Sequence, residues 1–289
     1  MGKTDGIRLR RRVQKEISTL TSFFTFVTIL ISHVIPYASY HTTMTATAVA
    51  KDILIGILVA DFVVAGFHWF EDTYLEYTSR PGFIGDIARD NDMHHAVPFA
   101  ITRETLASNL QVPTVLAIVV LGIWIAITPT FARHHPAFFV ALFVVAATAN
   151  VLHRWQHERD CSRPWIVTSL QRLGVLCSRD QHASHHERPN TKYGVVLGFT
   201  NPVYDTIGIW RGLEMLVRVF TGIEPHPKPG NSFYESVHDD WLRTNGKKTC
   251  PARIPDERMN AYTTRLRRLR TRYRQNGDMM IEADGKDTL

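Results

Sequence analysis

Four apolar runs in the chain are long enough to cross a lipid bilayer, and they constrain the fold more than any other feature. They cover residues 19–35, 53–70, 112–131 and 137–152. Each run has 16 to 20 residues, and a bilayer core needs about 20 residues of helix, within a range of about 17 to 25. The fourth run is slightly short and is expected to continue through His153. We therefore expect an all-α integral membrane protein with about four transmembrane helices.

Basic residues set the expected orientation of these spans. Arginines crowd residues 1–17, the loop of residues 36–51 contains only Lys51, and the turn between the third and fourth runs contains only Arg133. Basic residues return after residue 153. By the positive-inside rule, both termini are expected in the cytosol. The net charge of +6 then favours anionic lipid over nucleic acid as the partner of the basic ends.

The chain is expected to have three parts. Residues 1–17 form a basic cytosolic tail, residues 18–229 a membrane-bound domain, and residues 230–289 a polar, basic and partly disordered tail. No small-residue cleavage site follows the first apolar run, so it is interpreted as a retained span. Residues 165–177 and 204–220 alternate apolar and polar side chains near the helical period. They are expected to lie at the membrane interface as a cytosolic helical cap, with Trp165 and Trp210 as anchors.

Eight of the fourteen histidines fall on the cytosolic side of this topology. A His-x3-His pair on a helix projects both rings from one face, and a His-x2-His-His run adds three more ligands within a few residues. One zinc ion needs at most four ligands, so eight histidines predict two metal ions. The candidate ligands are His68, His94, His95, His153, His157, His182, His185 and His186. The adjacent pair His134 and His135 falls on the opposite side and is not expected to bind metal.

Two polar residues stand one helical turn from candidate ligands. Asp72 follows His68 by four residues, and Asn150 precedes His153 by three. A carboxylate or amide in this position can hold the second ring nitrogen of the histidine or bind the metal itself. We expect Asp72 and Asn150 to act at the catalytic site. Asp61, seven residues before His68, is a further candidate, although polar residues also hold membrane helices together.

Several other kinds of site are excluded. The three cysteines lack a Cys-x2-Cys pair, which excludes a disulfide framework and a thiolate zinc site. His157-Glu158 and His186-Glu187 lack the second histidine of a His-Glu-x2-His protease. Imidazoles without thiolates suit iron, zinc or copper, and a site beside the bilayer makes a lipid chain the natural reactant. Zinc would hydrolyse that lipid, whereas two irons with O2 can remove hydrogen from a methylene group.

Motifs spread over about residues 55–225 are similar to those of one known family. The shared stretches are Asp61-Phe62, Gly66-Phe67-His68-Trp69, Asp72-Thr73, His94-His95 with Pro98, His153-x-Trp155-x-His157, Gln181-His182-x2-His185-His186, Tyr193, Asn201 and Trp210-Arg211-x-Leu213-Glu214. In this combination the chain resembles the Kua family of lipid desaturases. That family includes animal plasmanylethanolamine desaturase, its bacterial relatives and the plant plastid enzyme that desaturates palmitate on phosphatidylglycerol.

The resemblance implies two iron ions on the eight histidines, with Asp72 as the family's aspartate. It also implies O2 as the oxidant and electrons from a cytochrome b5 or ferredoxin type donor. No b5-type haem domain is recognisable in the chain, so the donor is expected to be a separate protein. Ordinary acyl desaturases begin with a His-x3-4-His motif, and here Asn91 occupies the place of the missing histidine.

Two branches of that family share features with the chain. Asp72-Thr73 and the Trp210-to-Glu214 run are similar to the plasmalogen-forming branch, whereas residues 107–110 and 178–186 are similar to the plastid branch. Leu110-Gln111-Val112 stands where the animal branch usually has Gly-Asp-Asn. Residues 1–17 are poor in serine, which argues against a plastid transit peptide.

These features predict conversion of plasmanylethanolamine to plasmenylethanolamine, a phospholipid substrate, in an endoplasmic-reticulum-like membrane if the source is eukaryotic. One alternative is delta-3 trans desaturation of palmitate on phosphatidylglycerol, in a plastid or a bacterial inner membrane. A lipid hydroxylase with the same ligands is a second alternative. A metal transporter is the non-enzyme alternative, for which Asp61 is the one strong polar candidate in the middle of a span.

Overall fold

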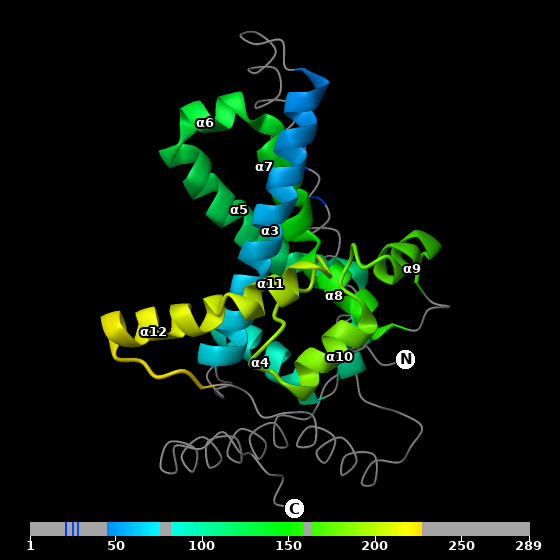
Figure 1. Cartoon of the computed structure of the whole chain (residues 1–289), viewed down its shortest axis with the longest axis vertical. Helices are drawn as coiled ribbons and strands as arrows, with labels where there is room; N and C mark the ends of the chain where they lie inside the picture. The colour runs from blue at the N-terminus through cyan, green and yellow to red at the C-terminus, as the bar shows by residue number, and fades with distance from the viewer. Residues whose placement is uncertain are drawn as a thin grey trace, which may run out of the picture. The chain divides into compact units, whose positions relative to one another are not determined.

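The computed structural model describes residues 45–75, 82–96, 98–158 and 163–226, together with the helical residues Thr21, Thr25 and Thr28. Within these ranges the regular elements are helices, and one isolated antiparallel bridge joins Leu176 to Leu197. The helices shown in Figure 1 are α3 (Ala46–Tyr74), α4 (Phe83–Ala96), η2 (Pro98–Arg103), α5 (Leu106–Ile127), α6 (Pro129–His134), α7 (Pro136–Ala147), α8 (Ala149–His157), α9 (Trp165–Arg172), α10 (Arg179–Glu187), α11 (Thr200–Thr206) and α12 (Ile209–Thr221). The all-α prediction is confirmed for the described residues.

Two helices are long and apolar enough to cross a membrane. They are α3, with 29 residues, and α5, with 22, so the second and third predicted spans are confirmed as candidates. The 29 residues of α3 extend for about 43 Å at about 1.5 Å per residue, which exceeds a bilayer core of about 30 Å. Its apolar stretch lies between Asp52 near one end and Glu71 near the other. The last turn of α3 is therefore expected at the membrane boundary.

The fourth predicted span is not one straight helix. Its residues form α7 and α8, which pass the length and hydropathy test only as a pair and bend by 43°. The bend is at Thr148, whose hydroxyl donates to the carbonyl of Val144, 2.7 Å away. Such back-bonding by threonine bends helices. The structure thus supports two or three spans among the described residues. Of the first predicted span only Thr21, Thr25 and Thr28 are described, and the tail of residues 230–289 lies outside the described residues.

The described chain divides into two compact units. The first contains residues 45–64 and 104–154, and the second contains residues 65–75, 82–96, 98–103 and most of the chain from residue 155 to 226. Each unit has its own buried apolar cluster. We describe the two units separately.

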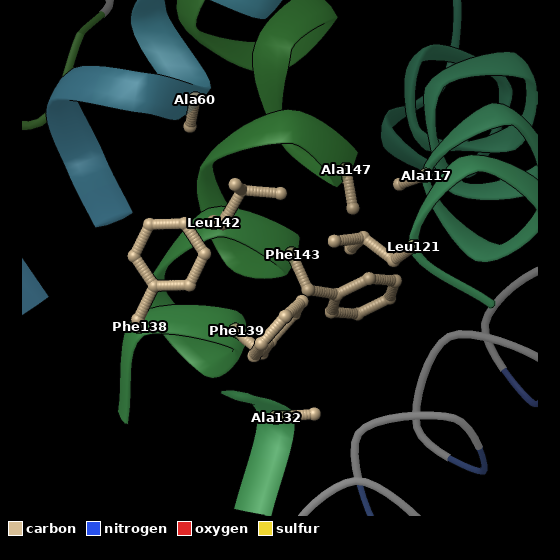
Figure 2. Close-up of a cluster of buried hydrophobic side chains, with 9 residues drawn as sticks. All are labelled: Ala60, Ala117, Leu121, Ala132, Phe138, Phe139, Leu142, Phe143 and Ala147. Atoms are coloured by element: carbon tan, nitrogen blue, oxygen red, sulfur yellow. The ribbon is translucent and has the colours of Figure 1, made fainter. Parts of the chain in front are cut away.

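The core of the first unit is an aromatic cluster on α7. Figure 2 shows that Phe138, Phe139 and Phe143 point into a cluster that also includes Leu121 of α5. The rings of Phe138 and Phe139 meet edge to face, with their centroids 5.1 Å apart. Proline occupies the first position of both α6 and α7, where its missing N–H costs no helical hydrogen bond. This cluster packs α5, α6 and α7 together.

The predicted interface helices differ from expectation in two ways. The stretch of residues 165–177 is helical only as far as Arg172, and residues 204–220 are divided between α11 and α12 by Gly208, whose φ of +68° is in the left-handed region. Trp165 is 78% exposed and fits an anchor, but Trp210 is 2% exposed. The prediction that Trp210 is an interface anchor is therefore wrong, because its indole packs in the core of the second unit.

The close approach of α3 and α7 in the first unit gives a test of the fold. A Cβ added at Gly56 would lie 2.6 Å from the carbonyl oxygen of Phe138, whereas one added at Gly122 would meet nothing within 4 Å. We expect Gly56→Ala to destabilise the protein by about 1–3 kcal/mol through overpacking. Gly122→Ala should stabilise it slightly, because alanine is favoured over glycine within a helix. Thermal unfolding in detergent measures both, and an equal shift for the two variants would contradict the packing.

Candidate metal centre

The second unit brings seven of the eight predicted histidine ligands into two groups of buried or half-buried side chains. We call His94, His157, His182 and His186 the first group, and His68, Asp72, His95 and His185 the second group. Within each group the potential ligand atoms lie within 4.8 Å of one another. Six of these seven imidazoles are buried, and His157 is half-buried.

Two helices distribute their histidines between both groups. Adjacent residues on a helix point about 100° apart, so His94 and His95 of α4 belong to different groups. On α10, His182 and His186 are one turn apart and join the first group, whereas His185 joins the second. The two groups are therefore neighbours that share α4 and α10, and each could hold a metal ion.

A capping box fixes the start of the nine-residue helix α10. The hydroxyl of Ser178 accepts a hydrogen bond from the backbone N–H of Gln181, and the side-chain oxygen of Gln181 accepts one from the N–H of Ser178. Gln181 also donates through Nε2 to the carbonyl of Gly198, 2.8 Å away. So short a helix is marginal by itself, and these bonds hold its three histidines in place.

Asp72 lies at the middle of the second group. Its Oδ1 is 2.9 Å from Nε2 of His95, and its Oδ2 is 3.1 Å from Nε2 of His185 and 3.5 Å from Nε2 of His68. Asn91, one turn before His95, donates from Nδ2 to the Oδ1 atom at 2.9 Å. The carboxylate thus lies among the ligand nitrogens, and the asparagine at the position of the missing histidine orients it.

Two backbone carbonyls orient the imidazoles of the second group. Nδ1 of His68 is 2.9 Å from the carbonyl oxygen of Tyr193, and Nδ1 of His185 is 2.7 Å from that of Thr191. Since a carbonyl can only accept, Nδ1 must carry the hydrogen, and a neutral ring then has its lone pair on Nε2. Both Nε2 atoms face Asp72. Lone pairs and a carboxylate in contact, buried from water, need a cation between them, which is what a metal site provides.

The first group consists of imidazoles. Nε2 of His182 and Nε2 of His186 are 3.0 Å apart, and the rings of His157 and His182 have their centroids 4.6 Å apart. Two neutral imidazoles can approach in this way when one donates to the other or when both bind the same cation. The donor set of nitrogen atoms without thiolates suits iron, zinc or copper.

The two remaining predicted residues, Asn150 and His153, lie on α8, in the part of this helix that belongs to the first unit. His153 is one turn before His157 and is buried, with 8% of its surface exposed. Asn150 is half-buried in the first turn of the same helix. The spacing still directs Asn150, His153 and His157 to one helical face. The roles of His153 as a ligand and of Asn150 as its partner stay predictions.

The carbonyls that orient the histidines belong to one segment, residues 190–197, which we call the carbonyl strap. Besides Thr191 and Tyr193, the strap presents the carbonyl of Val195, which accepts from Nε2 of Gln156 on α8 at 2.5 Å. Successive carbonyls two residues apart thus bind side chains of α10, α3 and α8.

Side chains of α11 and α12 fix the strap from its other side. Asn201 accepts from the N–H of Gly194 and donates to its carbonyl, both at 2.8 Å, and fills the space that a side chain at Gly194 would need. Asp205 accepts from the N–H of Lys192, which has a φ of +58°. Arg211 donates to the carbonyl of Asn190 at 2.7 Å. Asn201 and Arg211 stand among the shared motifs, but sequence patterns assign no role to them or to Gln156, because their bonds are to backbone atoms distant in the chain.

Comparison with known proteins gives one family. Residues 57–228 match the lipid desaturase domain. The chain is 32% identical over 193 residues to a probable fatty acid desaturase of Acanthamoeba polyphaga mimivirus, covering 65% of this chain and 90% of the viral protein. It is 31% identical over 192 residues to the chloroplastic fatty acid desaturase 4 of Arabidopsis thaliana, covering 65% of this chain and 55% of the plant protein.

A third relative has a different substrate in its name. The plasmanylethanolamine desaturase of Myxococcus xanthus is 30% identical over 217 residues, which cover 73% of each protein. No solved structure matches the chain.

The pair of hydrogen bonds between Asn201 and Gly194, which we call the clasp, can be tested by its effect on metal binding. We expect Asn201→Ala to weaken metal affinity by roughly 10- to 100-fold, the range seen when partners of metal ligands are removed. Asn201→Asp keeps the acceptor for the Gly194 N–H and should have a smaller effect. Titration of the metal-free protein with Co(II), followed by its visible absorption, measures the affinity. Thr206→Ala, on the exposed side of α11, is the control, and equal affinities for it and Asn201→Ala would contradict the clasp.

Proposed function

The chain belongs to the lipid desaturase family, and from this premise we propose that it is a di-iron enzyme that converts plasmanylethanolamine to plasmenylethanolamine. Family membership makes it an oxidoreductase. The observation that carries the proposal is the pair of buried groups, which offer imidazole nitrogens and the Asp72 carboxylate and contain no thiolate. Nitrogen and carboxylate ligands with positions left open are typical of irons that react with O2.

The proposed ligands follow the two groups. The second group would hold one iron through His68, His95 and His185, with Asp72 as ligand or partner. The first group would hold the other, with His153 added one turn before His157. Two irons bound in this way supply the oxidising power to remove hydrogen from an unactivated methylene group. The carbonyl strap keeps Nε2 of His68 and His185 directed inward, and burial of the ligands excludes water that would compete for the oxidant.

The electron balance of the overall reaction determines which partners the enzyme needs. The lipid chain loses two hydrogen atoms, O2 takes up four electrons and becomes two water molecules, and two of those electrons must come from outside. We propose a separate cytochrome b5 or ferredoxin type protein as the donor. The apolar spans α3 and α5 give the alkyl chain of a phospholipid a route within the membrane, and we propose that both termini of the protein face the cytosol.

The choice of substrate rests on two features. The bacterial relative whose name specifies plasmanylethanolamine matches 73% of both proteins, and Asp72-Thr73 at the site is similar to the plasmalogen-forming branch. The plant relatives are named as chloroplastic fatty acid desaturases and match a smaller share of their own length. Together with the similarity of residues 107–110 and 178–186 to the plastid branch, they support desaturation of palmitate on phosphatidylglycerol as the second candidate. In eukaryotic cells the first reaction would take place in an endoplasmic-reticulum-like membrane.

Lipid analysis is the direct test. The protein is made in a host that has plasmanyl lipids but no plasmalogens, and lipids are measured by mass spectrometry. We expect a new acid-labile ethanolamine lipid that is lighter by two hydrogen atoms. Unchanged ether lipids together with unsaturated palmitate on phosphatidylglycerol would favour the second candidate. A product heavier by one oxygen would identify a hydroxylase.

A pair of histidine variants tests the ligand assignment. We expect His153→Ala to abolish the product while the protein stays in the membrane, because one iron loses a ligand. His135→Ala is the control, since His135 is 41% exposed at its side chain and hydrogen-bonds Asp52 in the first unit. Its variant should keep most of the activity. Equal activity of the two variants in the lipid assay would refute the assignment.

A further inference from the structure

A row of aromatic rings begins at the second group of ligands. The ring of Tyr193 lies 5.5 Å from that of His185 and 6.2 Å from that of His68, centroid to centroid. On its other side Tyr193 meets Trp210 edge to face at 5.2 Å. Trp210 in turn stacks on Trp69, with 6.2 Å between centroids and 25° between planes. The rings are close enough for an electron to pass from one to the next.

The row leads outward from the buried site. Tyr193, Trp210 and Trp69 have 0%, 2% and 7% of their surface exposed. Tyr74 meets Trp69 edge to face at 5.5 Å, and Tyr204 meets Trp210 at 5.7 Å. Both of these tyrosines are half-buried. A path of phenol and indole rings thus connects the ligands to the surface of the second unit.

A buried carboxylate lies beside the second indole. The Nε1–H of Trp69 donates to Oε1 of Glu214 at 3.5 Å, and Glu214 is 7% exposed. Arg211 holds the other oxygen, with 2.6 Å between its NH1 atom and Oε2. Burial raises the pKa of Glu214, while the Arg211 charge lowers it. Glu214 is therefore placed to take up the proton that an indole releases when it is oxidised.

The row of Tyr193, Trp210 and Trp69 is made of phenol and indole rings, which have a chemical property beyond packing. Phenylalanine rings would also serve to bury apolar area in a core. Phenol and indole rings differ from these in that they give up an electron to a strong oxidant. The row begins against the ligands of the second group. Under the proposed function, on which this inference rests, a strong oxidant would form at these ligands.

We propose that Tyr193, Trp210 and Trp69 are an escape route for oxidising equivalents when no lipid chain is in place. One electron passes from Trp69 through Trp210 and across Tyr193 to the metal site, which is reduced by one electron. The oxidised Trp69 gives its Nε1 proton to Glu214 and becomes a neutral radical. A small thiol then returns a hydrogen atom to Trp69 and becomes a thiyl radical, while Glu214 releases its proton to water. Two thiyl radicals from two such events combine to form a disulfide. The ligands are spared from oxidation.

The route predicts which tryptophans are damaged without a reductant. The full-length protein is loaded with Fe(II) and exposed to O2 without lipid or thiol, and its peptides are analysed by mass spectrometry. We expect added oxygen on Trp69 and Trp210 and none on Trp165. Because Trp165 is 78% exposed, an oxidant diffusing through solvent would attack it first. Oxidation of Trp165 to the level of Trp69, or the same pattern in metal-free protein, would overturn the proposal.

Two substitutions test the steps of the route. In Trp210→Phe a ring remains but the first indole is removed, so oxidation of Trp69 per bound iron should be lost. Glu214→Gln keeps an acceptor oxygen for Trp69 but takes up no proton, so oxidation of Trp69 should fall. Trp165→Phe is the control and should leave oxidation of Trp69 unchanged. Unchanged oxidation of Trp69 in the Trp210→Phe protein would refute the route.

The test separates this inference from the proposed function. Iron content and desaturation of lipid with an electron donor are measured on the same preparations. A protein that desaturates lipid but shows no oxidation of Trp69 overturns the escape route alone. A protein that binds no iron and forms no product overturns the proposed function, and the escape route with it.

Discussion

The candidate metal centre depends on the two hydrogen bonds that His68 and His185 donate from Nδ1 to backbone carbonyls of the strap. Each bond places the hydrogen of a neutral ring on the outer nitrogen and leaves the inner nitrogen as a ligand. A backbone carbonyl is well suited to this task, because it cannot donate and so permits only one tautomer. The position of the strap therefore determines the position of the ligand atoms.

The strap in turn depends on helices that contribute no proposed metal ligand. Asn201 of α11 clasps Gly194, and Arg211 of α12 binds the carbonyl of Asn190. Because Arg211 also pairs with Glu214, which accepts from Trp69 next to His68, α12 is bonded both to the strap and to the neighbour of a proposed ligand on α3. A substitution on α12 can thus affect the metal site without contacting a metal ion.

The sequence predicts the components of the site better than their arrangement. Spacing and expected topology identify the histidines, since apolar runs and His-x3-His patterns are local features, and the structure brings seven of them together. Spacing and topology do not predict which of the seven histidines belong to which group, because that division depends on how α4 and α10 pack. Spacing places Asp72 near His68, but its contacts with His95 and His185 span distances of 23 and more residues. Trp210 is misassigned to the interface for the same reason, since its burial comes from Tyr193 and Trp69.

Burial of the ligands links metal binding to stability. In the absence of a cation, the lone pairs on His68 and His185 face the carboxylate of Asp72 at 3.1 to 3.5 Å, within a region from which water is excluded. That arrangement is unfavourable unless a proton or metal ion lies between the groups. A metal ion relieves it at once, and because the ligands come from α3, α4 and α10, the same ion joins three helices. The free energy of metal binding is therefore also free energy of folding for the second unit.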